Sequence, residues 1–318
     1  MIIAITGAAG FIGSSVAKRL LARGDTVIGI DNLNEYYDPE LKKARLKDIQ
    51  HKNFHFHQTD ITDYEALKEI ATKFQIDKIL HLAAQAGVRY SIENPFSYQE
   101  NNNKGTLNLL EICRHHNIPN FIFASSSSVY GGNTQFPFSE DQDVSHPVSL
   151  YAATKKNGEL MCYTYHHLYN INCRCLRFFT VYGPWGRPDM ALFKFTKGIL
   201  ENKPIDVYNH GKMKRDFTYI QDIVLGVIAA IDNDYQYEIF NLARGEVVEL
   251  MEYIRALEQA LGKKAQMNLM EIQPGDVPHT EADITKAQRM LGYAPKTSVK
   301  QGVQQFVDWY KEYYGEEQ

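Results

Sequence analysis

The chain opens with a short apolar run followed at once by three closely spaced glycines, and this pairing restricts its possible folds more than any other feature. The segment IIAITGAAGFIGSSVAKRLLARG places Gly7, Gly10 and Gly13 directly after an expected strand and at the start of an expected helix. A tight turn needs a residue without a Cβ, a pyrophosphate needs close backbone approach at a helix N-terminus, and the last glycine lets helix and strand pack. The segment therefore predicts a dinucleotide-binding turn, although such glycines can also serve structure alone.

Acidic residues follow the second and third expected strands. Asp31 ends the second strand, where its carboxylate can accept hydrogen bonds from an adenosine ribose and would repel a 2′-phosphate, so NAD is favoured over NADP. TDITD adds Asp60 and Ile61, which suit the adenine edge. A capping role for Asp60 or Thr62 is the alternative.

Short apolar runs alternate with longer helical patterns through the first half of the chain. Strands are expected at 2–6, 26–30, 53–58, 78–83, 120–126 and 173–179, and helices near 11–22, 40–48, 64–73, 97–116 and from Tyr151 onward. That order predicts an α/β fold with a doubly wound parallel sheet. We expect a Rossmann domain over residues 1–179, joined by a later strand near 238–242, and a smaller mixed α/β substrate domain formed mainly by residues 180–318.

Composition excludes several classes of partner. The formal net charge of −4 gives no basic field of the kind that nucleic-acid binders use. No stretch approaches the roughly 20 apolar residues of a membrane span, and the first residues read as a strand, without a charged n-region and an apolar h-region. We therefore expect a cytoplasmic protein with no nucleic-acid or membrane partner. The four cysteines have neither disulfide-framework density nor metal-ligand spacing, so buried reduced thiols and no metal are expected.

A second group of motifs lies between residues 81 and 155. YAATK at 151–155 puts a tyrosine and a lysine one helical turn apart, shortly after a run of four serines. Together with the glycine turn, HLAAQAG at 81–87, Asn101 and SSSSVYG at 125–131, it resembles the extended short-chain dehydrogenase/reductase family of nucleotide-sugar enzymes along the whole chain. The resemblance implies that NAD is bound by Gly7, Gly10, Phe11, Ile12, Gly13, Asp31, Asn32, Asp60, Ile61, Leu82, Ala83, Ala84, Gln85, Asn101, Tyr151 and Lys155.

The same resemblance implies that Tyr151 is the catalytic acid/base and Lys155 its partner. A free phenol has a pKa of about 10, and an ammonium one turn away, with a positive nicotinamide ring, would favour the phenolate. The resemblance also implies a third catalytic residue within the serine run at 125–128, although serines at a strand end can serve the loop alone. The interval from Tyr130 to Tyr151 that is typical of similar galactose epimerases favours Ser126. Ser127 and Ser128 would then face the far end of the sugar.

Details of the motifs narrow the implied chemistry to redox epimerisation. Ser127 and Ser128 stand where similar dehydratases and many decarboxylases carry an acidic residue, so dehydration is not expected. RFFTVYGPWGRPDMALFKF at 177–195 closely resembles uronate 4-epimerases, which implies reversible C4 epimerisation of UDP-glucuronate to UDP-galacturonate through a 4-keto intermediate. Neutral-sugar epimerases usually have asparagine in place of Thr180.

Five further residues are expected to bind the UDP-sugar. Arg187 and Thr180 are candidates for holding its C6 carboxylate, with Arg89 as a second cation, because a guanidinium forks onto a carboxylate. A solvated loop arginine is the alternative for Arg187. By resemblance, Arg215 binds the diphosphate and Asp276 meets the nucleotide ribose. Gln273 departs from similar galactose epimerases, which often have a second phosphate-binding arginine there.

Other functions remain open at this stage. The chain could be a neutral UDP-hexose 4-epimerase, a UDP-glucuronate decarboxylase, or a non-catalytic NAD-sensing protein of the same fold. The last commonly loses the tyrosine or the lysine, and both are present here. Helices near 97–116 and 150–169 are expected to form a four-helix homodimer interface, as in similar enzymes, although their apolar faces could equally belong to the core.

Overall fold

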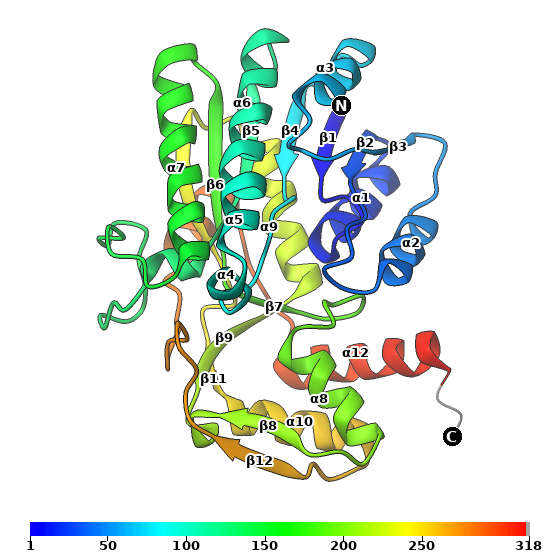
Figure 1. The fold of residues 1–318 in the computed structure, drawn as a ribbon, viewed down its shortest axis with the longest axis vertical. Coiled ribbons are helices and arrows are strands. Elements are labelled where there is room, and N and C mark those ends of the chain that lie inside the picture. Colours follow the sequence, from blue (N-terminus) through cyan, green and yellow to red (C-terminus); the bar gives the residue numbers. More distant parts are fainter. Residues whose placement is uncertain (316–318) are drawn as a thin grey trace.

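A seven-stranded parallel sheet forms the larger part of the protein, which a computed structural model describes over residues 1–315 (Figure 1). Its strands, in the spatial order β10-β6-β5-β4-β1-β2-β3, are β10 (Tyr237–Leu242), β6 (Asn172–Phe178), β5 (Asn120–Ser126), β4 (Lys78–His81), β1 (Ile2–Thr6), β2 (Thr26–Asp31) and β3 (Phe54–Gln58). The strand order reverses between β1 and β4. In doubly wound sheets, ligands bind beyond the carboxyl ends of the strands at this reversal.

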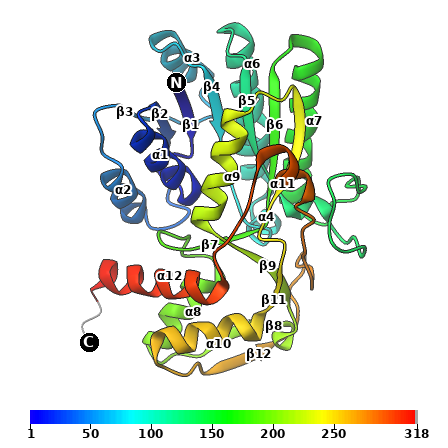
Figure 2. The same cartoon turned by 180° about the vertical axis from the view of Figure 1, so that it is seen from behind.

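Helices cover both faces of this sheet. On one face lie α3 (Tyr64–Lys73), α6 (Gly105–His115) and α7 (Leu150–Tyr169); on the other, seen in Figure 2, α1 (Phe11–Arg23) packs beside α9 (Ile220–Asp232). The alternation of side chains along β1 explains the two layers, because Ile3 and Ile5 enter the core under α1 and α9 whereas Ala4 enters the core under α3, α6 and α7. Beside β2 and β3, α2 (Pro39–Asp48) completes this part.

The helix expected near 97–116 is interrupted. The chain instead forms α4 (Tyr90–Glu93), α5 (Pro95–Tyr98), a π-helical segment η1 (Gln99–Lys104) and then α6. Asn102 in η1 donates to the carbonyl of Gln85 at 3.0 Å and to the hydroxyl of Thr154 at 2.9 Å, and it accepts from the Gln85 N–H at 2.8 Å. These tertiary bonds join η1 to the loop after β4 and to α7, and helical periodicity alone carries no sign of them.

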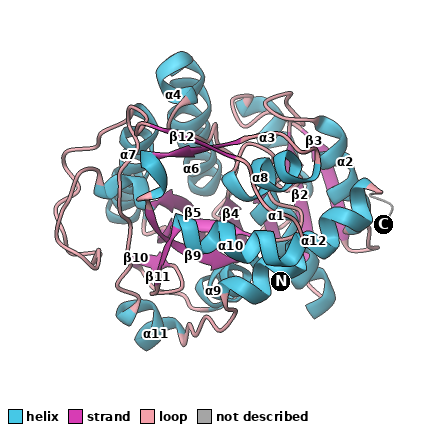
Figure 3. Cartoon of the chain, turned by 90° about the horizontal axis from the view of Figure 1, so that it is seen from below, coloured by secondary structure: helices cyan, strands magenta, loops and turns pink. Residues whose placement is uncertain are grey.

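The smaller part lies at the carboxyl ends of the parallel strands. It contains a three-stranded sheet of β7 (Thr180–Tyr182), β9 (Lys214–Tyr219) and β11 (Val247–Glu249), and a two-stranded sheet of β8 (Ile205–Tyr208) and β12 (Met267–Met270). Three helices pack on these strands: α8 (Ala191–Leu200), α10 (Leu250–Leu261) and α12 (Val299–Tyr314). Figure 3, the view from below, shows these helices across the end of the larger sheet.

The chain passes between the two parts more than once. The strand expected near 238–242 is β10, which pairs in parallel with β6 at the edge of the large sheet. Helix α9 also packs on that sheet although it follows residue 179, and α11 (Thr285–Leu291) contacts β10 and α9. The larger part therefore contains not only the returning strand β10 but also the later helices α9 and α11. Within residues 1–315, no helix is long and apolar enough to cross a membrane.

Candidate active site

A cavity of about 990 Å³ lies between the carboxyl ends of the parallel strands and the smaller part. Except for Asp60, every residue expected from the sequence to bind cofactor or substrate or to take part in catalysis lines it. The structure therefore brings into one space side chains that are up to 269 positions apart, from Gly7 to Asp276.

The glycine turn leaves room and donors for an anion. Gly7 has a φ of +71°, and a Cβ there would lie 2.8 Å from the backbone nitrogen of Ala83; a Cβ on Gly13 would collide with the carbonyl oxygen of Gly7. Gly10 is the N-cap of α1, so no side chain caps the first N–H groups of this helix. Uncapped N–H groups at a helix N-terminus are suited to a phosphate, and this part of the cavity fits a dinucleotide.

Asp31 is fixed at the end of β2 by two backbone donors. Its carboxylate accepts from the N–H of Ala9 at 3.1 Å and of Leu33 at 2.9 Å, which leaves lone pairs for ribose hydroxyls. Lys42 lines the same end of the cavity, and its ammonium donates to the backbone and side-chain oxygens of Asn34 at 2.6 and 2.7 Å. A cation therefore lies in the region where Asp31 is expected to meet the ribose.

Asp60 departs from the expected role. Its carboxylate accepts from the Asn32 side chain at 2.7 Å and from the N–H and hydroxyl of Thr62 at 2.8 and 2.7 Å, so it shapes the loop after β3 and does not line the cavity. The N-cap of α3 is Asp63, which accepts from Ala66. The helix cap considered for Asp60 is therefore not seen, and its carboxylate already has three donors.

The three expected catalytic residues come from β5 and the first turns of α7. Ser126 ends β5, and α7 begins with a cap in which Ser149 accepts from the N–H of Ala152 at 3.1 Å. This cap directs Tyr151 and Lys155, on successive turns, toward the end of the sheet, where both line the cavity. Ser126 lies close enough to the Tyr151 hydroxyl to lower the pKa of that phenol.

The electrostatics of this trio differ from the sequence-based expectation. Burial raises the pKa of Tyr151 above that of a free phenol, while Ser126 and the charge of Arg187 lower it. Lys155 donates to the carbonyl of Ala124 at 2.7 Å and lies 6.0 Å from the Tyr151 ring centroid, and burial lowers its pKa to about 7. The groups that favour the phenolate here are Ser126 and Arg187, because Lys155 is turned to a backbone carbonyl.

The serine run is divided between two tasks. The hydroxyl of Ser126 donates to the Ser128 hydroxyl at 3.2 Å and accepts from the Ser128 N–H at 3.2 Å, which opens the short helix η2 (Ser127–Tyr130). Ser127 and Ser128 also line the cavity. Of the four serines, the structure shows a contact with Tyr151 for Ser126.

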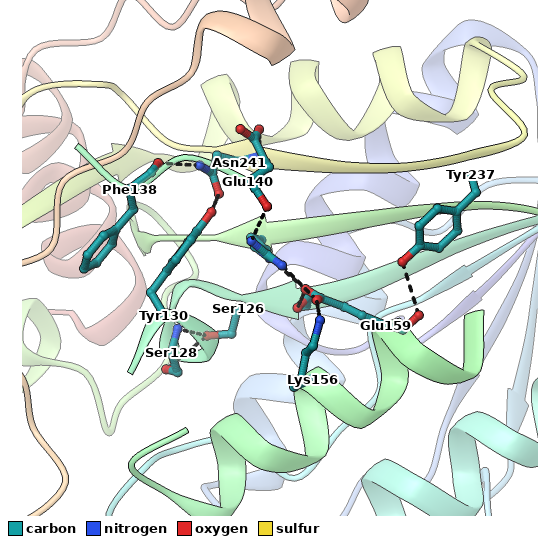
Figure 4. A network of polar contacts seen from close by, with 11 residues as sticks. Ser126, Ser128, Tyr130, Phe138, Glu140, Lys156, Glu159, Tyr237 and Asn241 are labelled. Atoms are coloured by element: carbon teal, nitrogen blue, oxygen red, sulfur yellow. Dashed lines mark hydrogen bonds and ion pairs between the residues drawn. The ribbon is translucent and has the colours of Figure 1, made fainter. Parts of the chain in front are cut away.

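A buried polar network lies behind these residues (Figure 4). Glu159, one turn beyond Lys155, accepts from the Arg177 Nε at 2.8 Å, from its Nη2 at 2.9 Å and from the Ser125 hydroxyl at 2.7 Å. Tyr130 continues the network by donating to Asn241 at 2.7 Å. The bonds connect β5, α7 and β6, and then η2 and β10, so they fix the elements that carry the expected catalytic residues.

The basic residues expected at the sugar separate into two groups. Arg187, in the loop before α8, is paired with Asp189 through Nε at 3.0 Å and Nη2 at 2.5 Å, and it lies near Tyr151. Thr180, at the start of β7, lines the same cavity.

Arg89 belongs to the second group. Its guanidinium donates to Asp276 at 2.8 Å and lies 4.6 Å from the Tyr208 ring centroid. Burial lowers the pKa of Arg215, whereas Asp276 raises it and Arg89 lowers it, so all three groups are neighbours. Arg89 therefore has a carboxylate partner of its own and lies beside Arg215.

Several lining residues were not expected from the sequence, among them Asp189, Lys42, Tyr36 and Tyr208. They lie in loops, at a strand end or, for Lys42, in helix α2, without a recognisable spacing. Asp189 stands only two positions after Arg187, and that separation was the available signal. Within residues 1–315, no three His, Cys, Asp or Glu side chains lie together in a way that could hold a metal ion.

Comparisons with known proteins agree with this geometry. The GDP-mannose 4,6 dehydratase family matches residues 4–306. The UDP-glucuronate 4-epimerase of Thermodesulfobacterium geofontis is 47% identical over 97% of this chain and 95% of its own length, and the UDP-glucuronate 4-epimerase 4 of Arabidopsis thaliana is 49% identical over 98% and 75%. The crystal structure of a UDP-glucuronic acid 4-epimerase from Bacillus cereus with UDP-glucuronic acid and NAD has a TM-score of 0.93 and 38% identity, covering 99% of this chain and 100% of that one.

Proposed function

The chain belongs to the GDP-mannose 4,6 dehydratase family of extended short-chain dehydrogenase/reductases, and from this premise we propose that it is an NAD-dependent isomerase that interconverts UDP-glucuronate and UDP-galacturonate at C4. One observation carries the choice of substrate. Arg187, a cation able to bind a carboxylate, lies close enough to Tyr151 to lower the pKa of that phenol. A sugar whose C4 hydroxyl meets Tyr151 would therefore place its C6 substituent within reach of a guanidinium.

Tyr151 acts as the general base and acid. It removes the proton of the C4 hydroxyl and returns it after the second transfer, while Ser126 hydrogen-bonds to the reacting oxygen atoms and Lys155 lies beside them at the cavity wall. NAD, held by the glycine turn and Asp31, would supply a hydride acceptor and donor for C4 when bound. Between the two transfers the 4-keto sugar must turn in the cavity.

The residues at the C6 end protect a labile intermediate. Oxidation at C4 makes the uronate a β-keto acid, which loses CO₂ when the C5–C6 bond stands perpendicular to the carbonyl plane. Arg187, Thr180 and Ser127 hold the carboxylate away from that alignment. A charge-assisted hydrogen bond contributes about 1.5–3 kcal/mol, enough to change the partition between products by about ten- to a hundredfold.

The nucleotide is held by the other basic group. Arg215 and Arg89 converge beside Asp276 at the cavity wall, and two guanidiniums with one carboxylate leave net positive charge for a diphosphate. Arg89 thus provides a second phosphate-binding cation, although Gln273 provides none. Asp276 remains available to the nucleotide ribose.

We also propose a cytoplasmic homodimer. Apolar side chains are exposed along α6 and α7, with Leu107 42%, Leu160 54%, Tyr163 54% and Leu168 56% exposed, and a second copy of the same two helices would cover them. The four cysteines are free and buried, as suits a reducing compartment.

The activity is tested by incubating the purified protein with UDP-glucuronate and NAD and following the sugar by NMR. UDP-galacturonate is the expected product, and the Tyr151→Phe variant is the matched inactive control. A UDP-pentose with released CO₂ would identify a decarboxylase, and turnover of UDP-glucose alone would identify a neutral-sugar epimerase. No turnover of either sugar would favour the NAD-sensing alternative.

A further inference from the structure

The guanidinium of Arg187 already has an anionic partner within the chain. Nε and Nη2 donate to the two oxygens of Asp189, so one edge of the guanidinium is occupied. A guanidinium has five N–H donors, and this bidentate pair uses two of them. The two N–H groups of Nη1 and the second one of Nη2 remain for a ligand. Both side chains line the cavity, with 23% of Arg187 and 28% of Asp189 exposed.

Asp189 is itself held in place from the larger part of the protein. The Tyr36 hydroxyl, in the loop after β2, donates to its Oδ2 at 3.4 Å. Burial raises the pKa of Tyr36, so this hydroxyl keeps its proton at neutral pH. Although burial raises the pKa of Asp189, the charge and hydrogen bonds of Arg187 lower it overall. Arg187 therefore faces an ionised carboxylate at neutral pH before any substrate binds.

Two carboxylates would share one cation when a uronate is bound. The charge of Asp189 opposes that of the sugar carboxylate, so the net attraction of Arg187 for the substrate is reduced. This matters for a reaction in which C4 must present both faces to the same cofactor, because the carboxylate has to leave Arg187 while the ring turns. A guanidinium without a permanent counter-ion would retain it.

We propose that Asp189 is a positioning residue that acts through Arg187: as a permanent counter-ion, it orients the free edge of the guanidinium and allows the substrate carboxylate to be released during each turn of the sugar. The inference rests on the proposed function, since a neutral hexose would make no such contact. The competing explanation is that the pair only holds the loop between β7 and α8 in shape. The two explanations predict opposite changes in uronate affinity.

The test is Asp189→Asn, which keeps the size of the side chain and one acceptor but removes its charge. Dissociation constants are measured by calorimetry on NAD-loaded protein in a Tyr151→Phe background, where the ligand is not consumed. We expect UDP-glucuronate to bind about tenfold more tightly, the order of one charge-assisted hydrogen bond, with UDP-glucose unchanged within about twofold. In the Asp189→Asn enzyme with Tyr151 intact, both kcat and KM for UDP-glucuronate should be lower than in the wild type.

Three further variants separate this effect from others. Asp189→Glu keeps the charge, so the ratio of its dissociation constants for UDP-glucuronate and UDP-glucose should be close to that of the wild type. Asp206→Asn makes the same chemical change in the same cavity, at a carboxylate bonded to Asn268, and should shift both ligands alike. In an Arg187→Ala background, Asp189→Asn should no longer alter uronate affinity, because the residue through which it acts is gone.

The proposal is overturned if Asp189→Asn weakens UDP-glucuronate binding, if it leaves the affinity unchanged, or if its effect persists without Arg187. Asp189→Ser serves as a second neutral variant if the asparagine variant does not fold, and the same sign is expected. A wild-type protein that binds but does not epimerise UDP-glucuronate would refute the proposed function, whereas these affinity ratios judge the role of Asp189 separately.

Discussion

Replacing Glu159 by glutamine should lower the melting temperature of the protein by about 4–7 °C. The Glu159 side chain is 0% exposed and that of Arg177 1%, and three hydrogen bonds of 2.7–2.9 Å end on the carboxylate. Glutamine cannot neutralise the guanidinium, and leaving a buried charge without its partner costs about 3–5 kcal/mol. With an unfolding entropy of about 2.1 cal/mol/K per residue over 318 residues, that loss corresponds to the stated shift.

Differential scanning calorimetry of the ligand-free protein measures this shift. Glu65→Gln is the matched control, because Glu65 forms an exposed ion pair with Lys68, and its loss should change the melting temperature by less than about 1 °C. Replacing both partners, with Glu159→Leu and Arg177→Met, should cost less than the single change because no charge stays buried. A single variant within 1 °C of wild type, or a double variant that is worse than the single one, would refute the reasoning.

Three other changes test the site. The ligand-free protein should bind NAD in preference to NADP. Asp31→Asn should reduce that preference, because Lys42 remains to meet a 2′-phosphate. Equal affinity of the wild type for both cofactors would remove the role given to Asp31. Arg187→Ala should weaken UDP-glucuronate binding and raise the share of UDP-pentose and NADH among the products. Mass spectrometry measures the sugar and absorbance the NADH. Equally weakened binding of UDP-glucose would assign Arg187 to the diphosphate. Lys155→Met should abolish turnover yet raise the melting temperature at pH 7. Burial lowers the Lys155 pKa to about 7, so the unfolded chain binds more protons between pH 7 and 10.5 and wild-type stability rises with pH across that window; a melting temperature whose pH dependence is the same in both proteins would contradict this.

The elements of the larger sheet were predictable because each signal was local. The glycine turn marked the end of β1 and the start of α1, and the centre of the buried strand β5 is a continuous apolar run. The π-helical η1 was not predictable, since Asn102 adopts it through bonds to Gln85 and Thr154. The three-residue strands β7 and β11 are too short to show a period. Helix α12 did carry a signal, because its buried Val303, Phe306 and Tyr310 recur at helical spacing.

Within the cavity, the residues found from the sequence belong either to a spaced motif or to a segment that resembles the family. Tyr151 and Lys155 share one helix, so their separation already implies a common face. The partner of an ion pair is set by loop conformation, which is why the contacts of Arg89 with Asp276 and of Arg187 with Asp189 came only from the structure. Asp60 shows the reverse case, because the nearby loop residue Thr62 donates hydrogen bonds to a carboxylate that was expected to meet a ligand.

The repeated passage of the chain between its two parts has a mechanical consequence. The segments between β6 and β7, between β9 and α9 and between β10 and β11 all connect the large sheet with the smaller part. A single linker permits hinge bending, whereas several short connections side by side resist it. The two parts should therefore move as one rigid body, and a nucleotide sugar should enter by displacement of the loop that carries Asp276 at the cavity wall instead of by rotation of one part against the other.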